Sequence, residues 1–337
     1  MKDLLIITKN DIWGCVFGEY IQRYHNLLYF HFPILKGRRQ KFSSKKKRLM
    51  QELYAFIKII LNVTKIDNRK TFCTGCQLGV LAAYKILSPF LKDYSLFIYN
   101  FYLHGLSNKK VVKLVLRFLL DNKHLTLICQ SPNEVKFYKE LSNRAYITFV
   151  PYCSDIMPHS YELKQKELCN YFFSGGFTNR DYNLIGKLAE RYPNQQFVIV
   201  ASALNKKIND MPRNVYVYKD LTNEEFNNLL SHSEAVIVAL YEDVGSSGQI
   251  LSISAMRKKK PIIYTDISAI NYYFPQGCGY PYKIGDIDSL EAAYKKIVNN
   301  WEEAVKVGER AYKQSLQYKS SNCYEQIYKL IFTSNEC

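Results

Sequence analysis

The feature that most constrains the fold is the segment over residues 245–266, GSSGQILSISAMRKKKPIIYTD. It reads as a Gly/Ser turn, a helix and an apolar strand, and it directly follows another apolar strand at residues 235–240. A helix that links two apolar strands is typical of a parallel sheet. A glycine turn that opens a helix at the carboxyl end of such a strand presents backbone N–H groups to a phosphate. The segment therefore predicts a parallel α/β domain built to hold a nucleotide.

The same alternation of strands and helices runs along the whole chain. In the first half we expect strands at residues 4–8, 28–32, 71–73, 95–99, 125–129 and 147–150. In the second half we expect them at residues 171–174, 197–201, 215–218, 235–240 and 261–265. Strands that alternate with helices predict parallel sheets covered on both faces. The expected fold is therefore α/β, with two Rossmann-like domains that face each other across a cleft.

A polar stretch marks the boundary between the two domains. The chain has 337 residues, which exceeds the length at which one core stops growing. Residues 151–170 are polar, contain two prolines and show no periodicity. We predict an N-terminal domain over residues 1–155, a linker over 156–170 and a C-terminal domain over 171–337, whose last helix could pack back on the N-terminal domain. No stretch is apolar enough to span a bilayer and the start resembles no secretory signal, so we expect a cytoplasmic location or attachment to the inner face of a membrane.

The excess of positive charge lies in the first half. Residues 1–150 hold 25 Lys+Arg and 9 Asp+Glu, and the chain totals of 46 and 30 leave 21 of each for residues 151–337. The densest run ends with Lys45, Lys46, Lys47 and Arg48, directly before the apolar pattern LMQELYAFIKIILNV. Basic residues beside an amphipathic helix attract anionic lipid. We expect this run to contact a membrane surface or an acceptor, and the alternative is a solvated basic loop.

Two glycine-containing turns in the second half are candidate phosphate sites. Gly175 and Gly176 follow a predicted strand, and Arg180 comes shortly after them. Glycines let a ligand approach the backbone closely, and an arginine can pair bidentately with a phosphate. The second group consists of Glu242, Ser246, Ser247, Gly248 and Gln249. Its hydroxyl and amide groups can bind a sugar or a diphosphate. The alternatives are an ion pair between Arg180 and Asp181 and a plain serine N-cap.

These pieces follow one another in the order of a known domain. The stretches FSGGFTNRDYNLIGKLAERYPNQQFVIV, VYKDLTNEEFNNLLSHSEAVIVAL and SSGQILSISAMRKKKPIIYTD resemble the donor domain of GT-B glycosyltransferases, over most of residues 171–332. The resemblance points to the large retaining group with a C-terminal nucleotide-sugar domain, and in the first half it is architectural only. It implies a nucleoside-diphosphate sugar as co-substrate, no cofactor and no essential metal ion, because basic groups and helix dipoles replace the cation.

One departure from the family concerns the chemistry of the donor turn. Retaining members carry two glutamates eight positions apart, which contact the donor sugar and its ribose, and the matching positions here are Ser246 and Ser254. A carboxylate clasp on the ribose is then absent unless Glu242 or Asp243 takes that place. The resemblance therefore specifies the location of the donor site more closely than its chemistry, and it leaves inversion and retention open.

The candidate catalytic residues lie in the first half. His104 follows the strand at residues 95–99 and precedes a glycine, so its imidazole could act as a base on an acceptor hydroxyl. The alternative is a packed structural histidine. Asp11 and Glu19 flank a turn that we expect around Gly14 and Gly18, after the first strand. A carboxylate there would suit an inverting displacement, which needs a base for the acceptor hydroxyl.

The combined prediction is a hexosyltransferase that moves a sugar from a nucleoside-diphosphate sugar to a glycan acceptor, including a lipid-linked one. The natural setting is the synthesis of surface polysaccharides, capsule or lipopolysaccharide, at an anionic membrane surface. Two alternatives stay open. A nucleotide-sugar 2-epimerase has the same fold but needs carboxylates and histidines that converge on one sugar carbon. A non-enzymatic polyanion or nucleic-acid binder would explain the basic half, although no nucleic-acid-binding motif accompanies the charge.

Overall fold

The chain divides into two units, each with its own parallel sheet. Unit 1 comprises Met1–Pro151 and Cys323–Cys337, and unit 2 comprises Tyr152–Asn322. The computed structural model describes residues 4–8, 12–31, 45–101, 110–155, 168, 170–176, 178–202, 205, 208, 210–243 and 245–333. The two sheets confirm the predicted α/β class with two Rossmann-like domains.

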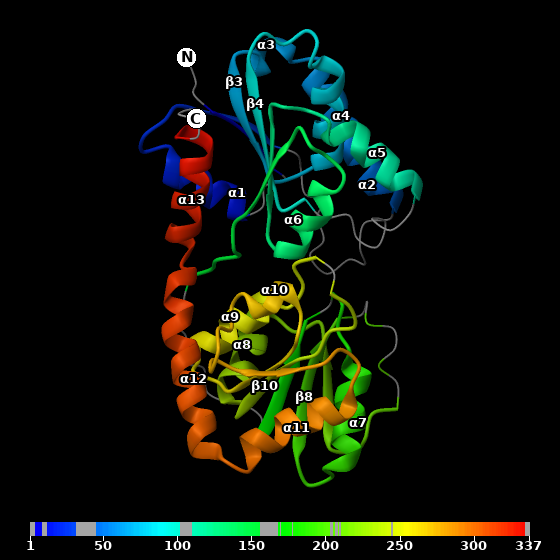
Figure 1. Cartoon of the computed structure of the whole chain (residues 1–337), viewed down its shortest axis with the longest axis vertical. Coiled ribbons are helices and arrows are strands. Elements are labelled where there is room, and N and C mark those ends of the chain that lie inside the picture. The colour runs from blue at the N-terminus through cyan, green and yellow to red at the C-terminus, as the bar shows by residue number, and fades with distance from the viewer. Residues whose placement is uncertain are drawn as a thin grey trace. The chain divides into compact units, whose positions relative to one another are not determined.

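Unit 1 is built around a six-stranded parallel sheet of order β2-β1-β3-β4-β5-β6 (Figure 1). Its elements, with α13 beginning three residues earlier in unit 2, are β1 (Leu4–Thr8), α1 (Ile12–Ile21), β2 (Leu27–His31), α2 (Lys45–Ile60), α3 (Val63–Ile66), β3 (Arg69–Cys73), α4 (Gln77–Leu87), β4 (Tyr94–Tyr99), α5 (Lys110–Leu120), β5 (Leu125–Cys129), α6 (Pro132–Lys139), β6 (Tyr146–Phe149) and α13 (Ser320–Phe332). All six strands expected from the apolar runs are present.

The helices of unit 1 cover both faces of this sheet. Helices α2, α4 and α5 gather on one face, and α1 and α13 lie on the other (Figure 1). On the α13 face, the ring of Phe17 in α1 packs 4.7 Å from Phe72 and 5.6 Å from Tyr324. On the opposite face, Gly79 lets α4 approach α2 closely, because a Cβ at Gly79 would lie 2.0 Å from the carbonyl oxygen of Glu52. Helix α2 is therefore packed closely against α4.

The turn expected around Gly14 and Gly18 is wrong, because α1 is a continuous helix through both glycines. Phe17 and Ile21 are fully buried and stand four residues apart, so they form the inner face of a helix. Gly18 serves packing instead of a turn, since a Cβ there would lie 2.0 Å from the hydroxyl of Tyr29. The glycines thus allow close contact within a helix.

Unit 2 contains a second six-stranded parallel sheet, of order β12-β11-β10-β7-β8-β9. Its elements are β7 (Tyr171–Gly175), α7 (Tyr182–Arg191), β8 (Gln196–Ala201), β9 (Val215–Lys219), α8 (Asn223–His232), β10 (Ala235–Val238), α9 (Gln249–Arg257), β11 (Ile262–Thr265), α10 (Ser268–Asn271), β12 (Tyr280–Tyr282), α11 (Ile287–Val298), α12 (Trp301–Ser315) and the 3-10 helix η1 (Leu316–Tyr318). The five strands expected here are confirmed, and β12 joins the edge of the sheet beside β11.

The strand order of unit 2 creates a reversal point in the middle of the sheet. The chain runs outward from β7 through β8 to β9, then returns to the other side of β7 and continues outward from β10. This is the order of the Rossmann fold, in which ligands bind at the carboxyl ends of the strands where the direction reverses. The reversal point lies between β7 and β10, which pair in parallel through Phe172 and Ala235.

Candidate functional site

The two turns predicted from the sequence both emerge at this reversal point. The first turn follows β7 and leads to α7, and the second follows β10 and leads to α9. Parallel strands place their carboxyl ends at one edge of the sheet, so neighbouring strands bring both turns to the same edge. The structure therefore unites segments that are about 70 residues apart in the chain.

The first turn is shaped by a contact between Gly176 and Arg180. Gly176 has φ +118°, a left-handed conformation that a residue with a Cβ adopts only with strain. A Cβ at this position would also lie 2.6 Å from Nη2 of Arg180. The Arg180 guanidinium donates from Nε to the carbonyl of Gly175, at 2.8 Å, and from Nη1 to the carbonyl of Thr178, at 2.8 Å. The glycine thus makes room for the arginine, which in turn closes the loop.

The charge of Arg180 lacks an acidic partner in the described part of the chain. The side chain is 9% exposed, and burial lowers the pKa of its guanidinium below the usual value. The adjacent Asp181 accepts a hydrogen bond from the N–H of Leu184 as the N-cap of α7, so the ion pair considered between Arg180 and Asp181 is not formed. A buried cation without a carboxylate is costly to desolvate, and an anion that binds beside it recovers part of that cost.

The second turn ends at Gly248, the N-cap residue of α9. Gly248 has φ +91°, and a Cβ there would lie 2.8 Å from Cδ1 of Ile270 and 3.1 Å from Cγ1 of Val238. The first N–H groups of a helix have no intrahelical acceptor, and they carry the positive end of the helix dipole. The start of α9 therefore offers positive potential at the same edge of the sheet as Arg180.

Direct contacts tie the two turns together. The backbone N–H of Asp181 donates to the carbonyl of Ala239 at 3.0 Å, and the Asn179 side-chain amide donates to the carbonyl of Glu242 at 2.7 Å. Arg180 and Leu240 form an isolated antiparallel bridge. The groups at this edge of the sheet are thus held before any ligand binds.

The predicted donor residues differ in their exposure. The Glu242 side chain is exposed and Ser246 is half-buried, so both can reach a ligand from the turn. Ser247 and Gln249 are buried, at 8% and 2% exposure. Their backbone N–H groups flank Gly248 at the start of α9, where the sequence predicts contact with a diphosphate.

Sequence reasoning missed three residues that stabilise the site. Asn179 was not singled out, although it joins the two turns. The Tyr182 hydroxyl donates to the carbonyl of Gly176, and the Thr265 hydroxyl accepts from the N–H of Leu240 at 2.8 Å. Asn179 and Thr265 support backbone that follows another strand, β10, so the sequence carries no local signal for them. Tyr182 supports the glycine turn directly before its own helix.

The candidates of the first half are not assembled by the described residues. His104 and Asp11 lie outside them. Glu19 lies exposed on the third turn of α1, away from the carboxyl end of β1. Lys45, Lys46, Lys47 and Arg48 form the first turn of α2, so they begin the helix instead of preceding it. In the described ranges, no group of three His, Cys, Asp or Glu side chains could hold a metal ion.

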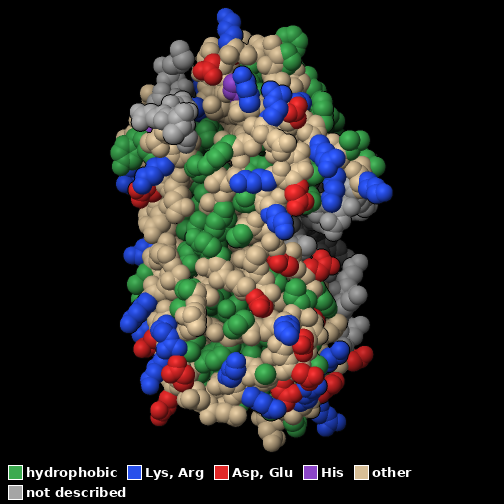
Figure 2. Space-filling model, viewed as in Figure 1, with side chains coloured by type: hydrophobic (Ala, Val, Ile, Leu, Met, Phe, Trp, Pro, Cys, Tyr) green, Lys and Arg blue, Asp and Glu red, His purple; other side chains and the backbone are tan. Residues whose placement is uncertain are grey.

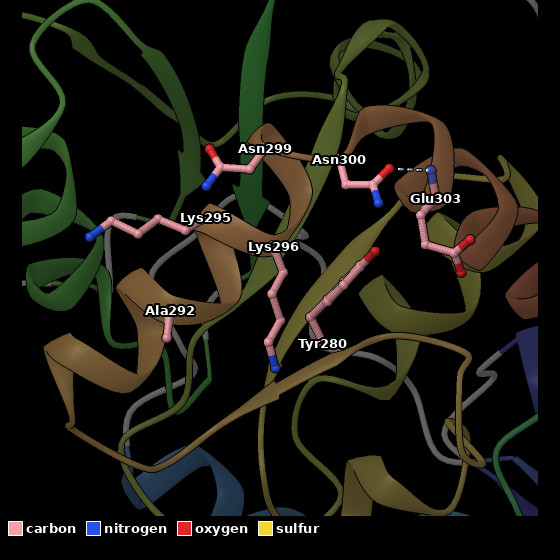
Figure 3. Close-up of a pocket in the computed structure, with 7 residues that line it drawn as sticks. All are labelled: Tyr280, Ala292, Lys295, Lys296, Asn299, Asn300 and Glu303. Atoms are coloured by element: carbon pink, nitrogen blue, oxygen red, sulfur yellow. Dashed lines mark hydrogen bonds between the residues drawn. The ribbon is translucent and has the colours of Figure 1, made fainter.

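A shallow pocket lies at the opposite edge of the unit 2 sheet. Figure 3 shows its lining residues on α11, α12 and β12, namely Tyr280, Ala292, Lys295, Lys296, Asn299, Asn300 and Glu303. Tyr280 is the first residue of β12, so this pocket is at the amino ends of the parallel strands. The reversal point is at the carboxyl ends, and the pocket is therefore not part of the candidate site.

Comparison with known proteins identifies the fold. Neither a family model nor a curated protein matches the sequence. Sucrose-phosphate synthase from Thermosynechococcus elongatus superposes with a TM-score of 0.74 at 13% identity, over 99% of this chain and 100% of that chain. HepE from Anabaena, solved with UDP and glucose, gives a TM-score of 0.70 at 13% identity, again over 99% and 100%.

A third solved structure is also similar to this chain. The lipopolysaccharide outer core galactosyltransferase WaaB, in its apo form, gives a TM-score of 0.67 at 13% identity, over 99% of this chain and 100% of that chain. Identities this low specify the fold alone, and they agree with the two Rossmann-like sheets. The chain has the GT-B fold, as the order of its second-half motifs predicts.

Proposed function

We propose that the protein is a glycosyltransferase that moves a sugar from a nucleoside-diphosphate sugar to a hydroxyl of a glycan acceptor. The observation that carries the proposal is the pairing of a buried Arg180, without an acidic partner among the described residues, with the start of α9 at the reversal point of unit 2. Both features favour a bound anion such as a phosphate group.

The same groups suit the chemistry of transfer. The bond between C1 of the donor sugar and the diphosphate oxygen breaks, and the acceptor oxygen forms a new bond to C1 as it loses its proton. Negative charge then develops on the departing diphosphate. The Arg180 guanidinium and the first turn of α9 would stabilise that charge as it forms, which lowers the barrier of the reaction.

The solved structures suggest which donor to test first. HepE was crystallised with UDP-glucose, with UDP, and with UDP and glucose, and WaaB is a galactosyltransferase. A UDP-hexose is therefore the first donor that we propose, with a hexose acceptor in a surface polysaccharide such as capsule or lipopolysaccharide. The acceptor would be lipid-linked and reached from the inner face of a membrane. No helix in the described part of the chain is long and apolar enough to cross a bilayer.

Thermal shift with nucleotides tests the donor site. A ligand that binds only the folded state raises the apparent melting temperature. We expect UDP or another nucleoside diphosphate to raise it more than the monophosphate, and the nucleoside to raise it least, because the phosphates are the groups held by Arg180. If no nucleoside diphosphate or nucleotide sugar shifts melting at millimolar concentration, the donor site is wrong.

Product analysis then separates the proposed reaction from its alternatives. Incubation of the preferred nucleotide sugar with a glycan acceptor should release the nucleoside diphosphate and form one new glycosidic bond. Conversion of the donor sugar to its epimer without an acceptor would instead identify an epimerase. Steeply salt-dependent binding of nucleic acid, with no affinity for nucleotide sugars, would identify a polyanion binder.

A further inference from the structure

The solvent-facing side of α5 is apolar. Val111, Leu114, Val115 and Phe118 recur at positions i, i+3, i+4 and i+7, which places them in one stripe along the helix. Their exposed fractions are 73%, 68%, 48% and 60%. The inner side of the same helix is buried through Leu116, Leu119 and Leu120. Helix α5 is thus apolar on two sides, and among the described residues only the inner one is covered.

Helix α2 repeats this pattern. Leu49, Leu53, Ile57 and Leu61 recur every four residues along the helix and its end, with exposed fractions of 67%, 47%, 45% and 77%. Its inner side includes the fully buried Ala55 and Ile59. A surface helix normally turns its polar side to water. Helix α2 therefore shows a second apolar stripe that faces out.

The two stripes belong to one face of unit 1. Helices α2 and α5 both contact α4, and all three lie on the same side of the sheet (Figure 1). We call the eight residues of the two stripes the α2/α5 surface. In the space-filling view, apolar and basic side chains crowd the upper right edge, where α4 and α5 lie (Figure 2). Single exposed apolar side chains are common, but stripes on two helices that both pack against α4 mark an interaction surface.

The charges on the two helices of the α2/α5 surface are mostly positive. The sequence of α5 includes Lys110, Lys113 and Arg117 and no acidic residue. Among the described residues, neither Lys110 nor Arg117 has an acidic side chain within ion-pair distance. Helix α2 includes five cations and one acid, Glu52, whose carboxylate accepts the N–H of Gly79 at 2.8 Å. One oxygen of that carboxylate is therefore directed at α4.

We propose that the α2/α5 surface docks on an anionic phospholipid membrane, with both helices lying in its interface. Helices that combine an apolar stripe with flanking lysines and arginines bind this environment, since the stripe enters the acyl boundary while the cations meet the headgroups. The sequence predicts membrane contact for the basic run that ends at Arg48. The proposal adds a second helix, α5, for which the sequence predicts no membrane contact.

Charge complementarity favours lipid over another copy of this chain. A two-fold contact would place the α2/α5 surface against itself, so lysines and arginines would face lysines and arginines. An anionic bilayer supplies the opposite charge and an apolar layer at once. The role of the surface rests on the proposed function, since it would bring the enzyme to a lipid-linked acceptor, but vesicle binding itself needs no donor or acceptor.

Vesicle flotation with the full chain tests the proposal. Vesicles of phosphatidylcholine, with and without phosphatidylglycerol, are mixed with the wild type, with a Leu114→Gln/Phe118→Gln variant, and with a Val298→Gln/Val305→Gln control. The control residues are exposed apolar side chains of unit 2, at 40% and 41%. We expect the wild type to float with phosphatidylglycerol vesicles, and the α5 variant to bind at least about tenfold more weakly. The control should bind like the wild type.

Two further measurements keep failure of folding apart from failure of docking. Circular dichroism and the thermal shift with UDP should be the same for the α5 variant and the wild type, because the substituted side chains point away from the core. Equal flotation of variant and wild type would overturn the proposal that the α2/α5 surface docks on a membrane. It would not contradict the proposed donor site. A wild-type dimer by light scattering that becomes a monomer in the variant, without flotation, would assign the α2/α5 surface to a second copy and overturn the lipid proposal.

Discussion

At the scale of single residues, the Arg180 side chain both closes a turn and carries a charge that an anion can neutralise. Its Nε and Nη1 close the first turn, while its charge has no acidic partner among the described residues. We expect Arg180→Lys to keep the charge but lose the fork, and to weaken binding of a nucleoside diphosphate by about 10- to 100-fold, since hydrogen bonds to charged groups contribute about 1.5–3 kcal/mol. Isothermal titration calorimetry measures the affinity.

The matched control for Arg180 is Arg191→Lys, at an exposed position on the same unit whose guanidinium pairs with Asp288 and Glu291. This substitution should leave nucleotide affinity unchanged. If Arg180→Lys binds the nucleotide as tightly as the control does, the arginine is only a structural closure of the turn.

Glu134 is a second residue whose surroundings set its chemistry. Its carboxylate accepts the N–H groups of Gln130 and Ser131, but Oε1 has no partner and the side chain is 7% exposed. Burial raises its pKa to about 7, so folding favours the protonated form. The stability that this group contributes is present below its unfolded pKa and is lost as the pH rises through its folded pKa.

We therefore expect Glu134→Gln to change the pH dependence of unfolding. Between about pH 5 and about pH 8, the free energy of unfolding of the wild type should fall relative to that of the variant, by a difference on the order of 3 kcal/mol at most. Urea titrations across this range give the slope. Glu140→Gln, at the exposed C-cap of the same helix, should leave the slope as in the wild type. Parallel curves for wild type and Glu134→Gln would contradict the expectation.

At the scale of elements, the strands were predictable and the site contacts were not. Most strands of four to six residues are runs of mainly apolar side chains between polar turns, and such runs need no tertiary information. The sequence did not predict helix α1, because its two glycines resemble a turn. Only the structure shows that Gly18 makes room for the hydroxyl of Tyr29. The elements α3, α10 and β12 have only three or four residues, too few to show a period.

The location of the site followed from the order of its motifs, but its geometry depends on strand order. The sequence places the first turn after one strand and the second turn after another, and nothing local says that β7 and β10 are neighbours. Asn179 contacts the carbonyl of Glu242 only because β7 and β10 are neighbours. His104 and Asp11 lie outside the described residues, so the acceptor side stays a prediction from sequence.

The junction of the second turn with α9 makes a prediction about an element. Gly248→Ala combines a positive φ with a Cβ 2.8 Å from Ile270, whereas Gly285→Ala has φ +68° and nothing within 4 Å of the new Cβ. Left-handed backbone costs about 1–2 kcal/mol in each variant, and overpacking adds about 1–3 kcal/mol only at Gly248. Urea unfolding should separate the two variants by that second amount.

The same pair should differ in binding. Gly248→Ala displaces the start of α9 and should weaken nucleoside-diphosphate binding, while Gly285→Ala should bind like the wild type. Equal losses of stability and equal affinities would show that the close packing of Gly248 against Ile270 does not position the helix.

At the scale of the whole molecule, the excess positive charge and the candidate donor site lie in different parts of the chain. The first 150 residues hold 25 Lys+Arg against 9 Asp+Glu, and the candidate donor site lies entirely in unit 2. Each unit also has its own buried core. Ligand binding should therefore stabilise one unit directly, by about 2.7 kcal/mol at a nucleotide concentration 100 times Kd.

Hydrogen exchange with a nucleoside diphosphate can locate that stabilisation. We expect slower amide exchange at the carboxyl ends of β7 and β10 and in the first turns of α7 and α9, because these segments form the two linked turns. The unit 1 sheet, which belongs to the other unit and has a buried core of its own, should exchange at an unchanged rate. Protection confined to the pocket that includes Tyr280 would contradict this prediction. It would place the ligand at the amino ends of the strands, where a phosphate contacts neither Arg180 nor the start of α9.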